Sequence, residues 1–107
     1  MKKYDLLIGG QYLPARSGRY FQVTNPATGD GVGLCAEAGV EDTQAALQAA
    51  HDAFPAWSRT PARTRCEIMH AAAAIFRGRI AELSRLLTTE QGKPVKDSNK
   101  ELQLPPT

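Results

Sequence analysis

The stretch that decides the fold is VEDTQAALQAAHDAFPAWSRTPARTRCEIMHAAAAIFRGRIAELSRLLTTEQGK, residues 40–93. Apolar side chains recur in it mostly at steps of three or four residues, which is the spacing of one side of an α-helix. Polar and charged residues fill the other sides. The pattern therefore predicts amphipathic helices that need a partner surface. The recurring positions fall in three lines: Val40, Leu47, Ala50, Phe54 and Trp57; Ile68, Ala72, Ile75 and Arg79; and Met69, Ala73, Phe76, Ile80, Leu83 and Leu87.

The first helix is expected to begin after Gly39 and to run from Val40 to Ala53 or Phe54, because Pro55 interrupts the pattern. Thr60-Pro61 is a strong helix start, since threonine can cap a helix and proline suits the first helical position. The second helix is expected to end at about Phe76.

A third helix is expected over Ile80 to about Glu90, because Gly78 weakens the pattern before it. Gly92 followed by Pro94 is a stop signal for this helix. Val95 to Leu102 could begin a fourth, short helix.

Short strands are expected before Gly39. Asp5–Ile8 and Gln11–Leu13 flank Gly9-Gly10, and two glycines between short apolar runs predict a tight hairpin. Tyr20–Thr24 alternates aromatic and β-branched residues, and Val32–Glu37 is a weaker strand. The chain is therefore expected to be α+β, with strands and a hairpin followed by three amphipathic helices.

Composition limits the function. The chain has 107 residues, enough for one small domain, and a net charge of +2 from 13 basic and 11 acidic residues. We therefore expect no nucleic-acid partner. No run approaches the roughly 18 apolar residues of a membrane helix, so no membrane partner is expected either. The N-terminus does not resemble a signal peptide, and Cys35 and Cys66 form no CxxC motif, so we expect a cytoplasmic protein with reduced cysteines.

Residues that could carry chemistry have plainer interpretations. Cys66 lies among arginines, which can lower a thiol pKa, but an ordinary helix cysteine is favoured. Cys35 is interpreted as a strand residue facing a core. His51 and His70 lie on different predicted helices with no nearby ligand pair, which argues against a metal site. No catalytic, cofactor-binding or metal-binding residue is therefore predicted in this chain.

The run Gly31-Val32-Gly33-Leu34-Cys35-Ala36 formally matches a dinucleotide-binding fingerprint, and Asp52 follows it at a fitting distance. The context does not fit, because a turn precedes the glycines and no helix opens on them. We interpret the run as a turn into a glycine-weakened strand. Glu90, Gln91 and Lys93 are explained by a helix end.

Three motifs, in this order and with matching spacers, carry a family resemblance: Asn25-Pro26-Ala27-Thr28-Gly29, Ala53-Phe54-Pro55-Ala56-Trp57 and Glu90-Gln91-Gly92-Lys93-Pro94. Residues 5–101 resemble the opening of an aldehyde dehydrogenase, with the succinate-semialdehyde dehydrogenases as the most similar group. The resemblance implies that residues 1–102 are a truncated N-terminal segment of the cofactor-binding domain. Residues 103–107 depart from the family, and a disordered tail is expected there.

The family oxidises aldehydes to carboxylates with NAD or NADP, and its nucleophile, base and cofactor loop lie beyond the matched region. The resemblance therefore implies an N-terminal portion that is inactive alone and binds no cofactor itself. A non-catalytic interaction module remains an alternative, whereas nothing supports an unrelated activity of the chain. Under both hypotheses the exposed helix lines are expected to drive self-association or docking on a full-length dehydrogenase subunit. The alternative is that the helices fold back on one another and close a small monomeric core.

Overall fold

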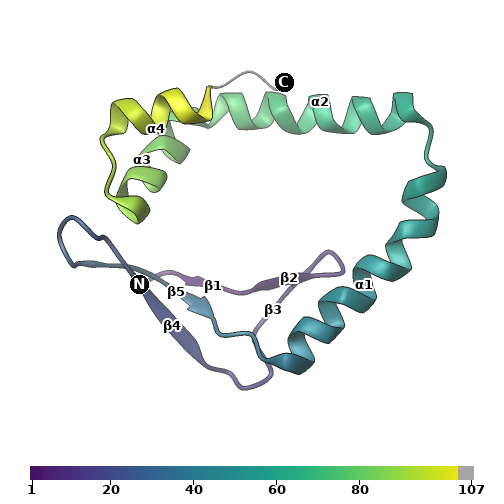
Figure 1. Cartoon of the computed structure of the whole chain (residues 1–107), viewed down its shortest axis with the longest axis horizontal. Coiled ribbons are helices and arrows are strands. Elements are labelled where there is room, and N and C mark those ends of the chain that lie inside the picture. Colours follow the sequence, from purple (N-terminus) through teal and green to yellow (C-terminus); the bar gives the residue numbers. More distant parts are fainter. Residues whose placement is uncertain (104–107) are drawn as a thin grey trace. The chain divides into compact units, whose positions relative to one another are not determined.

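The structure, a computed structural model, describes residues 1–103 (Figure 1). The chain divides into two compact units. One contains Met1–Val23 and Gly31–Thr60, and the other contains Thr24–Asp30 and the residues from Pro61 onward. Short strands precede the helices in sequence, so the α+β class is confirmed.

The first unit begins with the predicted hairpin. Strands β2 (Leu6–Ile8) and β3 (Gln11–Leu13) pair antiparallel, with Ile8 opposite Gln11. Gly9 and Gly10 connect them at φ 60° and 79°. These left-handed values are easily adopted by glycine, which explains why the two-glycine turn was readable from the sequence.

A separate three-stranded sheet has the order β1-β5-β4. Strand β4 covers Tyr20–Thr24 as predicted, and β5 covers Gly31–Ala36, close to its predicted range. Strand β1 (Lys3–Tyr4) was not predicted. It pairs parallel with β5, with Lys3 opposite Leu34. A two-residue strand has no period of its own, so only this long-range pairing defines it.

Helix α1 (Val40–Arg59) completes the first unit, with Gly39 as its N-cap. The prediction that it ends before Pro55 is wrong. Proline removes one backbone donor and disfavours the helix locally, but it does not exclude a helix, and side chains bond to carbonyls in the last turn. The Ser58 hydroxyl donates to the Pro55 carbonyl at 2.9 Å, and the Thr60 hydroxyl donates to the Ala56 carbonyl at 2.9 Å.

The second unit contains three helices. These are α2 (Ala62–Gly78), α3 (Ile80–Gln91) and α4 (Val95–Leu102). The expected break near Gly78 is confirmed, since Arg79 separates α2 from α3, and the short fourth helix is present. The prediction that Thr60 caps the start of the second helix is wrong. Thr60 is the C-cap of α1, and Pro61 is the N-cap of α2 rather than its first residue.

Helices α3 and α4 pack through small side chains. Ser84 of α3 and Ser98 of α4 are both fully buried. The hydroxyls of Thr88 and Ser98 lie 2.8 Å apart and share a hydrogen bond between the two helices. Gln103 caps α4, with its N–H donating to the Asn99 carbonyl at 3.1 Å. The remainder of the predicted tail, residues 104–107, lies outside the described residues.

Very little apolar surface is enclosed. Among residues 1–103, Ala15 and Ala36 are the only apolar residues that are well buried. Both are alanines, so neither contributes a large side chain to a core. The bulky apolar residues of α1 and α2 therefore lie mostly at the surface of their units, whereas Ile80, Leu83 and Leu87 of α3 are half-buried.

Candidate functional site

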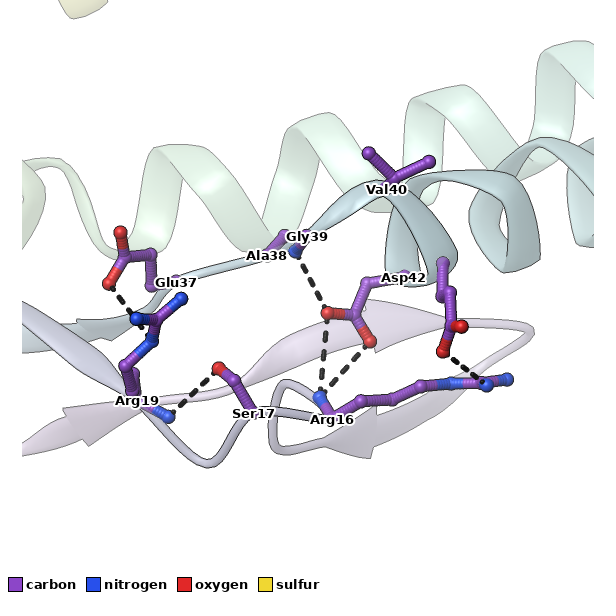
Figure 2. A pocket seen from close by; sticks show the side chains of 9 residues that line it. Arg16, Ser17, Arg19, Glu37, Ala38, Gly39, Val40 and Asp42 are labelled. Carbon is purple, nitrogen blue, oxygen red and sulfur yellow. Dashed lines mark hydrogen bonds and ion pairs between the residues drawn. The ribbon is translucent and has the colours of Figure 1, made fainter.

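A hollow of about 250 Å³ lies where the loop after β3 meets the start of α1 (Figure 2). The loop contributes Arg16, Ser17 and Arg19, and the chain between β5 and α1 contributes Glu37 to Gly39. The first turn of α1 closes it. All lining residues belong to the first unit. The sequence did not predict this hollow, because Arg16 and Asp42 on its two sides lie 26 residues apart in the chain.

Asp42 organises the hollow. Its carboxylate accepts hydrogen bonds from the Gly39 N–H at 3.0 Å and from the Arg16 N–H at 3.2 Å. The first bond satisfies a backbone donor at the helix start, where a negative charge is also favoured by the helix dipole. The second fastens the loop to the helix. Asp42 is only 7% exposed, so both bonds lie in a partly dry setting.

The other charged side chains pair in the open. Arg16 lies 2.9 Å from the Glu41 carboxylate, and Arg19 lies 3.9 Å from the Glu37 carboxylate, both pairs being largely exposed. The Ser17 hydroxyl accepts a hydrogen bond from the Arg19 N–H at 3.2 Å (Figure 2). This arrangement joins a loop to a helix but does not place a nucleophile beside a base. We therefore interpret the hollow as structural.

The cysteines and histidines are not brought together with other ligands. Cys35 is half-buried in β5, and Cys66 is exposed on α2. His70 lies one helical turn after Cys66, a spacing at which side chains can meet, but no hydrogen bond joins the two. Within residues 1–103, no group of three or more His, Cys, Asp or Glu side chains could hold a metal ion.

The glycine run at residues 31–36 does not fit a dinucleotide. It forms strand β5, in which the Leu34 N–H donates to the Lys2 carbonyl at 2.9 Å. A phosphate cradle needs a turn that opens directly into a helix, with free backbone amides. The interpretation of this run as a strand is confirmed, and we derive no cofactor contact from it.

The apolar side of α1 is the most unusual feature of the first unit. The helix contacts β2 through its small residues: Ala45 and Ala49 are half-buried, and Ala49 lies beside Gly9. The bulky residues lie on the other side, where Leu47 is 66% exposed and Phe54 is 67% exposed. The helix therefore packs its alanines inward and leaves the predicted apolar line uncovered within this unit.

Helix α2 repeats this arrangement in the second unit. Met69 is 65% exposed and Ile75 is 66% exposed, and both lie on the predicted apolar lines. Only Arg65 and Ala73 of α2 are half-buried, the rest being exposed. We call the exposed large apolar residues of the two helices the open apolar faces. They are Val40, Leu47, Phe54 and Trp57 on α1, and Ile68, Met69, Ile75 and Phe76 on α2.

Comparison with known proteins gives these faces a context. The model of the aldehyde dehydrogenase family matches residues 12–105, which is most of the chain. The chain belongs to the aldehyde dehydrogenase family. The resemblance inferred from the three sequence motifs is thereby confirmed.

Two bacterial relatives illustrate the match. This aldehyde dehydrogenase chain is 40% identical over 100 residues to the 3-sulfolactaldehyde dehydrogenase of Pseudomonas putida, covering 94% of the chain and 21% of the relative. It is 38% identical to the NADP-dependent succinate-semialdehyde dehydrogenase of Escherichia coli (strain K12), with the same two coverages.

Solved structures agree. An NADP-dependent enzyme of E. coli matches with a TM-score of 0.91 and 37% identity, over 94% of the chain and 21% of that structure. The succinate-semialdehyde dehydrogenase of Burkholderia pseudomallei matches with a TM-score of 0.89 and 32% identity, over 92% of the chain and 20% of that structure. The chain thus spans about a fifth of the length of the relatives it matches.

In the described part of the chain, no helix combines the length and the apolar character needed to cross a bilayer.

Proposed function

We propose that this chain serves as the N-terminal part of an NAD(P)-dependent aldehyde dehydrogenase, which oxidises an aldehyde to a carboxylate. In this proposal the chain supplies surface for the rest of the enzyme to pack on and performs no chemistry itself. The two cysteines, expected to be reduced, suit the cytoplasmic location that we propose for it.

The observation that carries the proposal is the exposure of the open apolar faces. A fully buried leucine or phenylalanine side chain stabilises a protein by roughly 1.5–3 kcal/mol relative to an exposed one. Leu47 and Phe54 forgo that stabilisation in this chain, although both lie on a regular helical line. Because the relatives are about five times as long, the remainder of such an enzyme is the natural cover for these faces.

The distribution of chemical groups supports a non-catalytic role. Aldehyde oxidation through a thiohemiacetal needs a thiolate, a base and an oxyanion donor held together. Cys35 is half-buried within a strand, and Cys66 is exposed on a helix with no hydrogen bond to His70. We therefore expect no NAD(P)H formation by the purified chain with any aldehyde, measured by absorbance.

We propose a short aldehyde with an anionic group as the substrate of the whole enzyme. The names of three relatives support this class: 3-sulfolactaldehyde, succinate-semialdehyde and glutarate-semialdehyde dehydrogenases. Each name describes an aldehyde that carries a sulfonate or a carboxylate. None of the relatives' substrates is assigned to this chain alone.

A segment exchange tests the proposal. The matched segment of the E. coli relative is replaced by this chain, and NADP reduction with succinic semialdehyde is measured. We expect the hybrid to be active. In the same hybrid, Leu47→Asp with Phe54→Asp should abolish activity by preventing assembly, whereas Gln48→Ser with Asp52→Ser, on the exposed polar side of α1, should leave it intact. A hybrid that assembles like the parent but is inactive, or tolerates the two aspartates, would contradict the proposal.

The alternative is an interaction module that docks on a complete dehydrogenase subunit. The same open apolar faces favour it, since they offer a helical docking surface. Mixing the chain with the intact E. coli enzyme separates the two functions. A stable complex between them, together with an inactive hybrid, would favour the module.

A further inference from the structure

Two of the sequence motifs that mark the family meet in the second unit, although about sixty residues separate them. The turn at Asn25–Asp30 lies against Gly92, at the end of α3. A Cβ atom added to Gly92 would lie 2.9 Å from Pro26 Cγ and 3.6 Å from the Ala27 backbone nitrogen. The first distance is too short for two carbon atoms in contact, so the turn approaches the chain where a side chain is absent.

The turn is internally rigid. The Asn25 side-chain oxygen accepts a hydrogen bond from the Ala27 N–H at 2.9 Å, and the Asn25 carbonyl accepts one from the Gly29 N–H at 2.7 Å. The Asn25 N–H donates to the Asp30 carbonyl at 2.8 Å, which closes the loop. A proline ring held in such a loop has few ways to yield to a clash.

The surface that receives the turn is equally defined. Gly92 has φ 77°, a left-handed conformation that ends α3, and its N–H donates to the Thr88 carbonyl at 2.7 Å. Lys93 forms an ion pair with Glu101 of α4, and Pro94 is the N-cap of that helix. The bend between α3 and α4 is thus fixed on both sides of Gly92. We call residues 92–94 the elbow.

We propose that the Asn25–Asp30 turn, which we call the strap, packs against the elbow and is held there because Gly92 has no side chain. The strap opens locally together with the α3–α4 pair. It does not open together with strands β4 and β5, between which it lies in the sequence. The family motifs at residues 25–29 and 90–94 then form the two sides of one packing contact. This inference concerns the chain's own packing and does not depend on any catalytic role.

Hydrogen exchange at the Gly29 and Asn25 amides, followed by NMR on the whole chain, reports the state of the strap. Gly92→Ala adds a methyl group at the point where Pro26 approaches Gly92. Gly10→Ala is a matched control: its φ of 79° imposes the same left-handed strain, but no atom of the described part of the chain lies within 4 Å of the added Cβ. We expect Gly92→Ala to speed exchange at Gly29 by about tenfold or more, as strain of this kind implies. Gly10→Ala should leave that amide unchanged.

A second substitution separates crowding from backbone strain. Pro26→Ala removes the ring atom that the new methyl would meet, so combined with Gly92→Ala it should restore most of the protection at Gly29. Unchanged exchange in Gly92→Ala, or no rescue by Pro26→Ala, would overturn the proposal. If Gly92→Ala does not fold, the unaltered chain still decides: a nuclear Overhauser contact between the Pro26 ring and Gly92 is expected, and its absence would refute the strap.

Discussion

Asp42 is the residue on which the start of α1 depends. Its carboxylate accepts hydrogen bonds from the N–H groups of Gly39 and Arg16. Asp42→Ala should lower the free energy of unfolding by about 1–3 kcal/mol, because two partly buried backbone donors lose their acceptor. Glu41→Ala is the control. It removes only the exposed pair with Arg16 and should cost less than about 1 kcal/mol. Urea unfolding followed by circular dichroism measures both, and equal losses would contradict this role for Asp42.

Tyr20 gives the first unit a pH dependence. Its hydroxyl donates to the Asp5 carboxylate at 2.6 Å, and this hydrogen bond raises the tyrosine pKa above its ordinary value of 10.0. The neutral phenol is the form that bonds. Its contribution to stability is therefore complete below pH 10.0 and is lost as the pH rises through the raised pKa.

An NMR titration of the Tyr20 ring tests this dependence. Asp5→Asn should lower the Tyr20 pKa, since both the charged acceptor and its negative charge are removed. Asp52→Asn is the control, because Asp52 lies on helix α1 and bonds to Gln48 rather than to Tyr20, and it should leave the midpoint in place. A midpoint that ignores Asp5→Asn would show that the bond does not exist in solution.

At the scale of elements, the contact between α3 and α4 contains an uneven pair of serines. Ser84 and Ser98 are both fully buried. Within residues 1–103, Ser98 has a partner in the Thr88 hydroxyl, whereas Ser84 Oγ has none. Ser84→Ala should raise the free energy of unfolding by about 1 kcal/mol, because an unsatisfied buried hydroxyl is removed. Ser98→Ala should lower it by about 0.5–1.5 kcal/mol. Thermal or urea unfolding compares them, and a loss in both variants would show that Ser84 has a partner in solution.

Helix α1 shows how far local sequence signals reach. Gly39 before an acidic first turn correctly predicted where the helix begins, because capping is a local property. The prediction that it ends before Pro55 is wrong, because a proline disfavours a helix without excluding it. The hydroxyls of Ser58 and Thr60 donate hydrogen bonds to the Pro55 and Ala56 carbonyls in the last turn. Helix propensities of single residues do not include such side-chain bonds.

The elements missed by the sequence depend on distant partners. Strand β1 exists through its pairing with Leu34 and Cys35, about thirty residues further on. The hollow beside α1 depends on the hydrogen bond from the Arg16 N–H to the Asp42 carboxylate. The sequence around either residue does not indicate this long-range bond. The Gly9-Gly10 hairpin and the break near Gly78 were predictable, because each is set by the conformational preference of residues within one turn.

In the molecule as a whole, the open apolar faces need cover that a single copy does not provide within its units. Leu47, Phe54 and Ile75 are each about two-thirds exposed. At roughly 1.5–3 kcal/mol for each buried side chain, several exposed ones forgo an amount comparable to the roughly 5–15 kcal/mol that stabilises a typical domain. Association through these faces would recover part of it.

The most direct test is light scattering on the purified chain over a range of concentrations, combined with hydrogen exchange across α1 and α2. We predict a weight-average mass that rises above the 11.6 kDa of one chain. Leu47→Ser with Phe54→Ser should shift it back toward the monomer, whereas Gln48→Ser with Asp52→Ser should not. A monomer at every concentration, with strongly protected amides throughout α1 and α2, would contradict the claim.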